Sequence, residues 1–412
     1  RDLPTQEFAQ LDPVYVIGSA SDRAPILTAL VSLGIEPEIV CDAAMARSIN
    51  FDDHDCIVLY IDMISVDQSG LQPSIEFNDF LNTSEGIKNG AGKLFVITAA
   101  SAPQGPEIYN ATGPQTTAAS LNYPASVLSA ALIAQATSYA SEQLEWGTVA
   151  IEIDDISSSF TALVSLLGHS APNGSRLSIK SGEIFEFSSE TLIRHEGSSE
   201  TLEFDPRKLQ VITGGLGGLG LATAQWMFTK GARKFILASR SGANEKAQRV
   251  ISDMRAGGAI IEIQRCDVSI SEDVTRLAKK AKSIAEIDRI IHAAGIRRDG
   301  LVADLRGDDF KLLSQVKLDG AVNLIRAFAE LNPSRIILYS STSGWVGAAG
   351  QSNYAASNAA LDCLAAFYFA QDIPIVSVAW GPWEKLGMTA GLSTNHLDRI
   401  SRTGYGFLDT DR

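Results

Sequence analysis

The sequence predicts an α/β protein with two mainly parallel sheets. Apolar runs of strand length alternate with amphipathic stretches from the first residues onward, a pattern typical of βαβ units. The length of 412 residues allows two to four domains. Hydrophobic residues make up 45% of the chain and charged residues 20%, which is a globular composition and excludes disordered, collagenous and coiled-coil proteins.

The first half contains the strands and helices of one such sheet. Helices with apolar residues at three- and four-residue spacing are expected at 24–33 and 126–142. The first strand runs into Gly18-Ser19-Ala20-Ser21, which lacks the glycines that would admit a pyrophosphate. We therefore expect a nucleotide-fold sheet that does not bind a cofactor. Its strands are predicted at 14–17, 38–40, 57–61, 94–98 and 149–153.

A polar, irregular stretch over residues 171–206 separates the two halves. Within it, RLSIKSGEIFEF alternates well enough to predict a hairpin. We place the boundary near Pro206, with a structural subdomain over 1–205 and a catalytic subdomain over 206–412.

The second half opens with a strand at 209–213, a glycine turn and a helical run, LATAQWMFTKGA. Glycines allow a tight turn and let a phosphate approach the helix N-terminus, where free N–H groups and the helix dipole favour an anion. A tight turn without a ligand is the alternative reading. The predicted cofactor residues of this turn are Thr213, Gly214, Gly215, Gly217, Gly218, Leu219 and Gly220.

The next strand, predicted over 234–239, ends at Ser239-Arg240. An NAD site usually offers an acidic side chain near this point, whereas an Arg pairs with a 2′-phosphate. The cofactor is therefore predicted to be NADPH, bound by a doubly wound parallel sheet. Arg240 could instead be a solvated surface charge.

Two further segments place polar groups at carboxyl ends of strands, the edge where ligands lie in an open parallel sheet. Asp267 and Val268 follow the third strand, and Asp267 is expected at the adenine end. His292 is as well explained by a packed, hydrogen-bonded position as by a cofactor contact. The residues predicted at the fourth strand are His292, Ala293, Ala294 and Gly295.

A Ser and a Tyr suited to carbonyl reduction follow. Ser341 lies in a loop of small residues after a strand at 335–339, and Tyr354 opens a helix thirteen residues later. One hydroxyl orients the carbonyl and the phenol donates the proton, provided that a cation lowers the phenol pKa. The lysine usually found four residues after the tyrosine is replaced by Asn358. Lys317, on a predicted long helix beside the tyrosine helix, is the candidate substitute, although each residue alone is also explained as a solvated charge or a local cap.

These residues resemble the ketoreductase domains of modular polyketide synthases and related multidomain fatty-acid synthases, a branch of the short-chain dehydrogenase/reductase superfamily. The resemblance covers essentially the whole second half. It rests on TGGLGGLG at 213–220, SRSG at 239–242, HAAG at 292–295, KLDGAVNL at 317–324, SSTSGWVGAAGQSNYAASNAALD at 340–362 and SVAWGPW at 377–383.

The resemblance implies NADPH-dependent reduction of a β-ketoacyl thioester, carried on an acyl carrier protein, to the β-hydroxyacyl thioester. By that analogy Tyr354 donates the proton, Ser341 binds the carbonyl, and Lys317 and Asn358 form the supporting pair. Such domains carry an N-terminal structural subdomain with a truncated Rossmann-like fold that lacks the cofactor, which the resemblance implies for the first half of this chain. Neighbouring synthase domains are the other implied partners.

Substrate contacts are expected on the segments that flank these motifs. A substrate lid is predicted over residues 386–398. Arg297 and Arg298 could receive the phosphopantetheine phosphate, or could be solvated loop charges. The sequence signatures for product configuration are mixed. Of the Leu-Asp-Asp motif found in members that form one alcohol configuration, this chain keeps only the last acid, Asp299. The Trp found in members of the opposite type stands one place early, at Trp345. The predicted substrate and lid residues are Asp299, Trp345, Gln351 and Met388.

Three other readings remain beside this one. About two hundred extra residues argue against a stand-alone fatty-acid-type reductase. A catalytically silent scaffold would show a broken set of catalytic residues, whereas all are present here. An epimerising domain is not separable by sequence, and neither are product stereochemistry, acyl chain length, α-substitution and oligomeric state.

The net charge of −14 argues against broad nucleic-acid or anionic-membrane binding. The four cysteines form no CxxC pair, no membrane span or signal peptide is visible, and no metal site is expected. We therefore expect a cytoplasmic protein with reduced thiols. The first residue is Arg1, which suggests a processed product or, as we favour, a segment of a longer protein.

Overall fold

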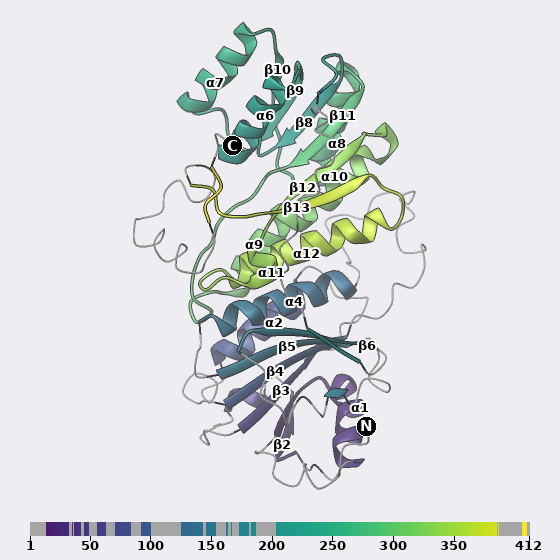
Figure 1. Ribbon diagram of the computed structural model, residues 1–412, viewed down its shortest axis with the longest axis vertical. Coiled ribbons are helices and arrows are strands. Elements are labelled where there is room, and N and C mark those ends of the chain that lie inside the picture. Colours follow the sequence, from purple (N-terminus) through teal and green to yellow (C-terminus); the bar gives the residue numbers. More distant parts are fainter. Residues whose placement is uncertain are drawn as a thin grey trace. The chain divides into compact units, whose positions relative to one another are not determined.

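Figure 1 shows the computed structural model of the chain. The chain forms two compact units. The first comprises Arg1–Glu190, Arg298–Leu312 and Ser343–Ala360, and the second comprises Thr191–Arg297, Leu313–Thr342 and Leu361–Arg412. The units therefore alternate along the chain, and a boundary near Pro206 in the sequence stays a prediction. The residues described are 14–32, 35, 37–42, 45–48, 56–62, 71–83, 92–99, 125–142, 146–153, 162–163, 166, 173–180, 183–186, 203–384, 386 and 406–409.

The first unit contains a sheet in the order β2-β1-β3-β4-β5-β6-β7. All neighbouring strands are parallel except β6 and β7, which form the predicted hairpin. A single strand, β2, lies on one side of β1, which agrees with a truncated Rossmann-like sheet. The bounds are β1 Val14–Gly18, β2 Ile39–Cys41, β3 Cys56–Asp62, β4 Gly92–Ala99, β5 Trp146–Ile153, β6 Ser175–Lys180 and β7 Glu183–Glu186.

Helices cover both faces of this sheet. Ile26 of α1 packs in the core on one face, and Phe77 of α2 and Leu132 of α4 pack on the other. The sequence did not predict α2 or the short 3₁₀ helix η2. The helices are α1 Ala20–Ser32, η2 Met45–Ser48, α2 Gln72–Thr83 and α4 Ala125–Ala140.

Helix α4 is apolar on nearly every side, as expected for a helix buried between layers. One side contributes Leu132 to the sheet core. Another side, at Ala134, packs against Ala355 and Ala359, which belong to the last segment of the same unit. Alanine side chains allow α4 and the helix that carries Ala355 and Ala359, α12 (Ser352–Phe369), to approach closely.

The second unit contains a fully parallel sheet in the order β10-β9-β8-β11-β12-β13, with every adjacent pair parallel. The order reverses between β8 and β11, where an open α/β sheet forms its ligand crevice. The predicted doubly wound sheet is confirmed. The strands are β8 Leu209–Thr213, β9 Lys234–Ser239, β10 Ile260–Arg265, β11 Ile287–His292, β12 Arg335–Ser341 and β13 Ile375–Trp380.

Helices α6 and α7 bury their apolar residues against one face of this sheet. Asn244 caps α7, where its side chain accepts a hydrogen bond from the Ala247 N–H. The predicted long helix around Lys317 is instead interrupted by a π-helical turn, η4. The helices of residues 203–384 are α6 Gly218–Thr229, α7 Glu245–Ala256, α8 Ser271–Ile284, α9 Gly307–Ser314, η4 Gln315–Asp319, α10 Gly320–Phe328, η5 Ala329–Leu331, α11 Ser343–Val346 and α12 Ser352–Phe369.

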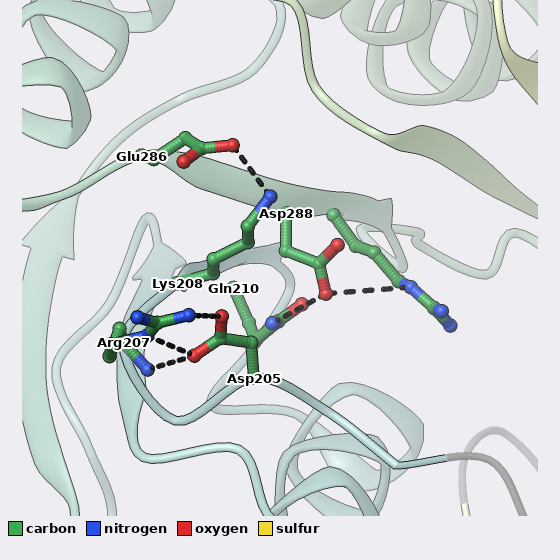
Figure 2. Close-up of polar contacts among 7 residues, drawn as sticks. Asp205, Arg207, Lys208, Gln210, Glu286 and Asp288 are labelled. Carbon is green, nitrogen blue, oxygen red and sulfur yellow. Dashed lines mark hydrogen bonds and ion pairs between the residues drawn. The ribbon is translucent and has the colours of Figure 1, made fainter.

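Polar contacts gather at the amino ends of β8 and β11 (Figure 2). Lys208 pairs with Glu286 at 2.6 Å, and Gln210 donates to Asp288 at 3.0 Å. Arg207 pairs with Asp205 and lowers the pKa of that carboxyl to about 2. Ion pairs this exposed contribute little stability. This end of the strands is opposite the carboxyl edge at which a ligand would bind.

Among the described helices, none is long and apolar enough to cross a membrane. The described residues also contain no cluster of three or more His, Cys, Asp or Glu that could hold a metal ion. Cys41, Cys266 and Cys363 are free thiols.

Candidate active site

The glycine turn between β8 and α6 has no room for a Cβ at Gly214, Gly215 or Gly220. Gly214 has a φ of 66°, and a Cβ there would lie 2.7 Å from backbone atoms of Ala293 and Ala294. A Cβ on Gly220 would overlap the Gly214 backbone. Helix α6 begins at Gly218, so this turn presents a helix N-terminus beside the switch point of the sheet. The geometry suits a phosphate group.

Predicted site residues lie at the carboxyl ends of neighbouring parallel strands. Thr213 ends β8 and pairs in register with His292, which ends β11. Ser239 ends β9, and exposed Arg240 follows it. Ser341 is the last residue of β12 rather than part of a loop, because that strand continues to pair with β13. One edge of the second sheet therefore carries these groups.

His292 is 1% exposed and hydrogen-bonded at both ring nitrogens. Its Nδ1 lies 2.8 Å from the Thr213 hydroxyl, and its Nε2 lies 3.1 Å from the Lys317 carbonyl oxygen. A carbonyl only accepts, so Nε2 carries the proton and Nδ1 accepts from Thr213. Burial, with the nearby Lys317 charge, lowers the pKa of His292 to about 4. The neutral ring occupies a packed position, and a cofactor contact stays a prediction.

The loop after β10 is held by hydrogen bonds within the loop and by one from α10. Asp267 Oδ1 accepts from the N–H and the hydroxyl of Ser269, at 3.0 and 2.7 Å. The Val268 carbonyl accepts from the Asn323 side chain at 2.9 Å. The orientation of the Asp267 carboxylate is thus fixed before any ligand binds.

Lys317 is 4% exposed and lies in the π-helical turn η4. Its Nζ donates to the Tyr339 carbonyl of β12 at 2.9 Å, two residues before Ser341. Burial lowers the pKa of Lys317 to about 8, and the Asp362 carboxylate partly opposes that change. A buried ammonium that titrates near neutrality is typical of a functional position.

Tyr354 and Asn358 lie in the first unit, near the start of α12. The Tyr354 N–H donates to Asn353 Oδ1 at 2.8 Å, and Asn353 Nδ2 donates to the Arg298 carbonyl at 2.9 Å. Asn358 is buried and donates to the Tyr354 carbonyl one helical turn earlier, at 2.9 Å. Lys317 and Ser341 belong to the second unit. Their pairing with Tyr354 therefore stays a prediction.

Residues 209–385 match the KR domain family. This match covers less than half of the chain, and it is a likeness of this segment to KR domains. The chain is 37% identical over 196 residues to the polyketide synthase GfsB of Streptomyces halstedii, and 38% identical over 198 residues to the putative inactive phenolphthiocerol synthesis polyketide synthase type I Pks1 of Mycobacterium tuberculosis. Each match covers 47% of this chain, but only 4% and 12% of those two proteins. The chain thus corresponds to a small part of each synthase.

The structural likeness also includes the first half. The ketoreductase PlmKR1, from the first module of phoslactomycin biosynthesis in Streptomyces sp. HK803, matches with a TM-score of 0.70 and 24% identity. The match covers 98% of this chain and 84% of PlmKR1. At that identity it establishes the fold alone, and the predicted α/β fold is confirmed.

Three of the predicted substrate residues, Asp299, Trp345 and Gln351, lie among the described residues. Gln351 donates to Asp299 at 3.3 Å. The Trp345 ring is 53% exposed and lies 5.7 Å from the Arg176 guanidinium of β6. Met388 and most of the predicted lid lie outside the described residues. Arg297 is exposed, as is Arg298, whose carbonyl is bonded by Asn353.

Sequence reasoning missed two contributors to this region. The Tyr339 carbonyl holds the Lys317 ammonium, and nothing in a strand sequence distinguishes one backbone carbonyl from another. Glu142, after α4, accepts backbone hydrogen bonds from Val302 and Gly350. An acidic residue after a helix gives no sequence signal for contacts 160 and 208 residues away.

Proposed function

We propose that this chain reduces a β-ketoacyl thioester to the β-hydroxyacyl thioester, with NADPH as the reductant. The observation that carries the proposal is the buried Lys317 ammonium, which lies at the carboxyl edge of the second sheet. The glycine turn follows β8 at the same edge, where the strand order reverses between β8 and β11. The KR domain match over residues 209–385 supports the same reaction class.

The turn fits a dinucleotide because its backbone leaves no room for side chains where a pyrophosphate would approach the start of α6. The residues that would hold the cofactor are this turn, Arg240 toward a 2′-phosphate, and the Asp267–Val268 loop toward the adenine. When bound, NADPH supplies the hydride.

The chain's own residues would orient the carbonyl and deliver a proton. Ser341 would donate a hydrogen bond to the carbonyl oxygen, and the Tyr354 phenol would donate the proton to it. A phenol with pKa near ~10 needs a cation to act at neutral pH, and the Lys317 ammonium would supply that charge. Asn358 would support Tyr354, as the family resemblance implies.

The substrate is proposed to arrive as an acyl chain on the phosphopantetheine of an acyl carrier protein. This step rests on the polyketide synthase relatives, of which the chain covers only a small part. Neighbouring synthase domains are proposed as further partners on the same ground. Asp299, Trp345, Gln351 and Met388 are the proposed substrate-side residues.

The test follows NADPH consumption with a racemic α-methyl-β-ketoacyl thioester, comparing wild type with Tyr354→Phe and adding chiral analysis of the product. Loss of one hydroxyl should lower turnover about a hundredfold or more. Tyr368→Phe is the matched control, because Tyr368 is a buried tyrosine of the same helix, α12. It should retain wild-type turnover.

If folded wild type consumed no NADPH, even with the thioester on a carrier protein, the proposal would fail. A silent scaffold or an epimerising domain would then be the better reading. Equal turnover by wild type and Tyr354→Phe would instead overturn the role of Tyr354.

A further inference from the structure

We propose that Glu142, in the half expected to be purely structural, is a positioning residue for the substrate side of the active site. It follows α4 and joins two loops that are about fifty residues apart in sequence, at Val302 and Gly350. The effect of Glu142 on catalysis rests on the proposed function, whereas its hydrogen bonds do not. The contacts themselves lie within the first unit.

Each carboxylate oxygen of Glu142 accepts from a different loop. Oε2 accepts from the Val302 N–H at 2.7 Å, and Oε1 accepts from the Gly350 N–H at 2.9 Å. The loops also meet directly, because the Gly300 N–H donates to the Gly350 carbonyl at 3.0 Å. Hydrogen bonds to a charged acceptor are stronger than those between neutral groups. Glu142 therefore fixes the spacing between the two loops.

The joined loops carry residues of the proposed site. Asp299 lies immediately before Gly300, and Gln351, immediately after Gly350, donates to its carboxylate. Tyr354 follows three residues later, at the start of α12. A displacement of either loop would change where Asp299 and Gln351 lie relative to the Tyr354 backbone.

Helix α4 supports the second loop at a further point. The Ala348 N–H donates to the Ser138 hydroxyl at 3.2 Å. Gly347 has a φ of 70°, and a Cβ there would lie 2.8 Å from the Ser138 backbone nitrogen. The loop thus lies directly on α4, and Glu142 extends this contact to the Val302 loop.

Substitution by glutamine is a sharp probe because it keeps the shape of the side chain. A carboxamide has one accepting oxygen, so its NH₂ group would face one of the two backbone N–H donors. Glu142→Gln should therefore lose one hydrogen bond and add a donor–donor repulsion. Glu142→Ala removes both bonds.

The experiment measures backbone hydrogen exchange in the full 412-residue chain, resolved at Val302 and Gly350. Both amides should exchange about tenfold faster or more in Glu142→Ala, and at least one should do so in Glu142→Gln. Glu152→Gln is the matched control, because Glu152 is a half-buried glutamate of β5 in the same unit. It should leave both amides protected.

The kinetic measurement separates positioning from general destabilisation. Both Glu142 variants should raise KM for the thioester about tenfold and erode the stereochemical purity of the alcohol, with an unchanged dissociation constant for NADPH. A lowered melting temperature with wild-type KM and product ratio would assign Glu142 a stability role and overturn the proposal.

Unchanged exchange at both amides in Glu142→Ala would also overturn it. If wild type consumed no NADPH at all, the proposed reduction would fail. Exchange at Val302 and Gly350 would still support or overturn the joining of the loops by Glu142.

Discussion

At the scale of single residues, the buried Lys317 ammonium predicts a pH dependence. Its pKa is lowered to about 8, so the group loses its proton as the pH rises through that value. If its charge keeps the Tyr354 phenol competent, kcat/KM should fall above about pH 8. Lys317→Met, which keeps length but not charge, should lower kcat/KM about a hundredfold at pH 7. A rate profile that stayed flat to pH 9.5 in the wild type would contradict this role.

His292 predicts a loss of stability in acid. Its pKa falls from 6.5 to about 4 on folding, so between these values the unfolded chain binds a proton that the folded protein excludes. The contribution of neutral His292 to the free energy of unfolding is complete above pH 6.5 and is lost as the pH falls toward 4. From pH 7.5 to 5, the free energy of unfolding should drop by about 2 kcal/mol more in wild type than in His292→Gln.

Urea unfolding at the two pH values gives this difference directly. Each protein serves as its own reference, so the cost of the substitution itself cancels. Equal losses in both proteins would show that His292 titrates normally in the folded state.

At the scale of secondary-structure elements, the β8–α6 turn predicts which glycine the cofactor site needs. Gly214→Ala combines a φ of 66° with a Cβ 2.7 Å from the Ala293 backbone, so the turn must move. NADPH affinity, followed by fluorescence titration, should fall tenfold or more. Gly258→Ala is the control, because Gly258 has a φ of 92° but nothing within 4 Å of its added Cβ. It should cost about 1 kcal/mol of stability and leave NADPH affinity unchanged.

If both alanine substitutions weakened NADPH binding to a similar extent, backbone strain would set the affinity, rather than the close approach of the turn to the backbone at Ala293. Retention of affinity in Gly214→Ala would mean that the turn does not form the phosphate site.

Most strands were predictable because buried parallel strands are short apolar runs, as at 209–213 and 57–61. Helix α2 was missed, since QPSIEFNDFLNT is weakly apolar and becomes helical through burial of Phe77 and Phe80. The π-turn at Lys317 was missed too. Its carbonyl is bonded by the His292 ring, a contact between separate elements that local sequence does not encode.

At the scale of the whole molecule, the motifs predicted the likeness to ketoreductase domains, but they did not predict how the chain divides into compact units. Composition and turn signals placed a boundary near Pro206. The segments 298–312 and 343–360, which hold Asp299 and Tyr354, nevertheless join the first unit. That assignment depends on contacts such as those of Glu142, whose partners are more than 150 residues away.

The two halves should therefore not fold independently at that boundary. Val302 is buried in the core cluster that contains Phe77, and the Leu305 carbonyl accepts from the side chains of Asn78 and Asn82 at 2.9 and 3.1 Å. A fragment of residues 206–412 would expose Val302 and leave that carbonyl without these partners. Expressed alone, it should aggregate or unfold without cooperativity, because buried apolar surface dominates folding stability.

Co-expression with residues 1–205 should restore a folded complex that consumes NADPH, since the missing contacts need no covalent link between the halves. Size-exclusion chromatography and thermal unfolding of the fragment, alone and co-expressed, measure this directly. A monomeric 206–412 fragment that unfolded cooperatively would show that the contacts to the first half are dispensable.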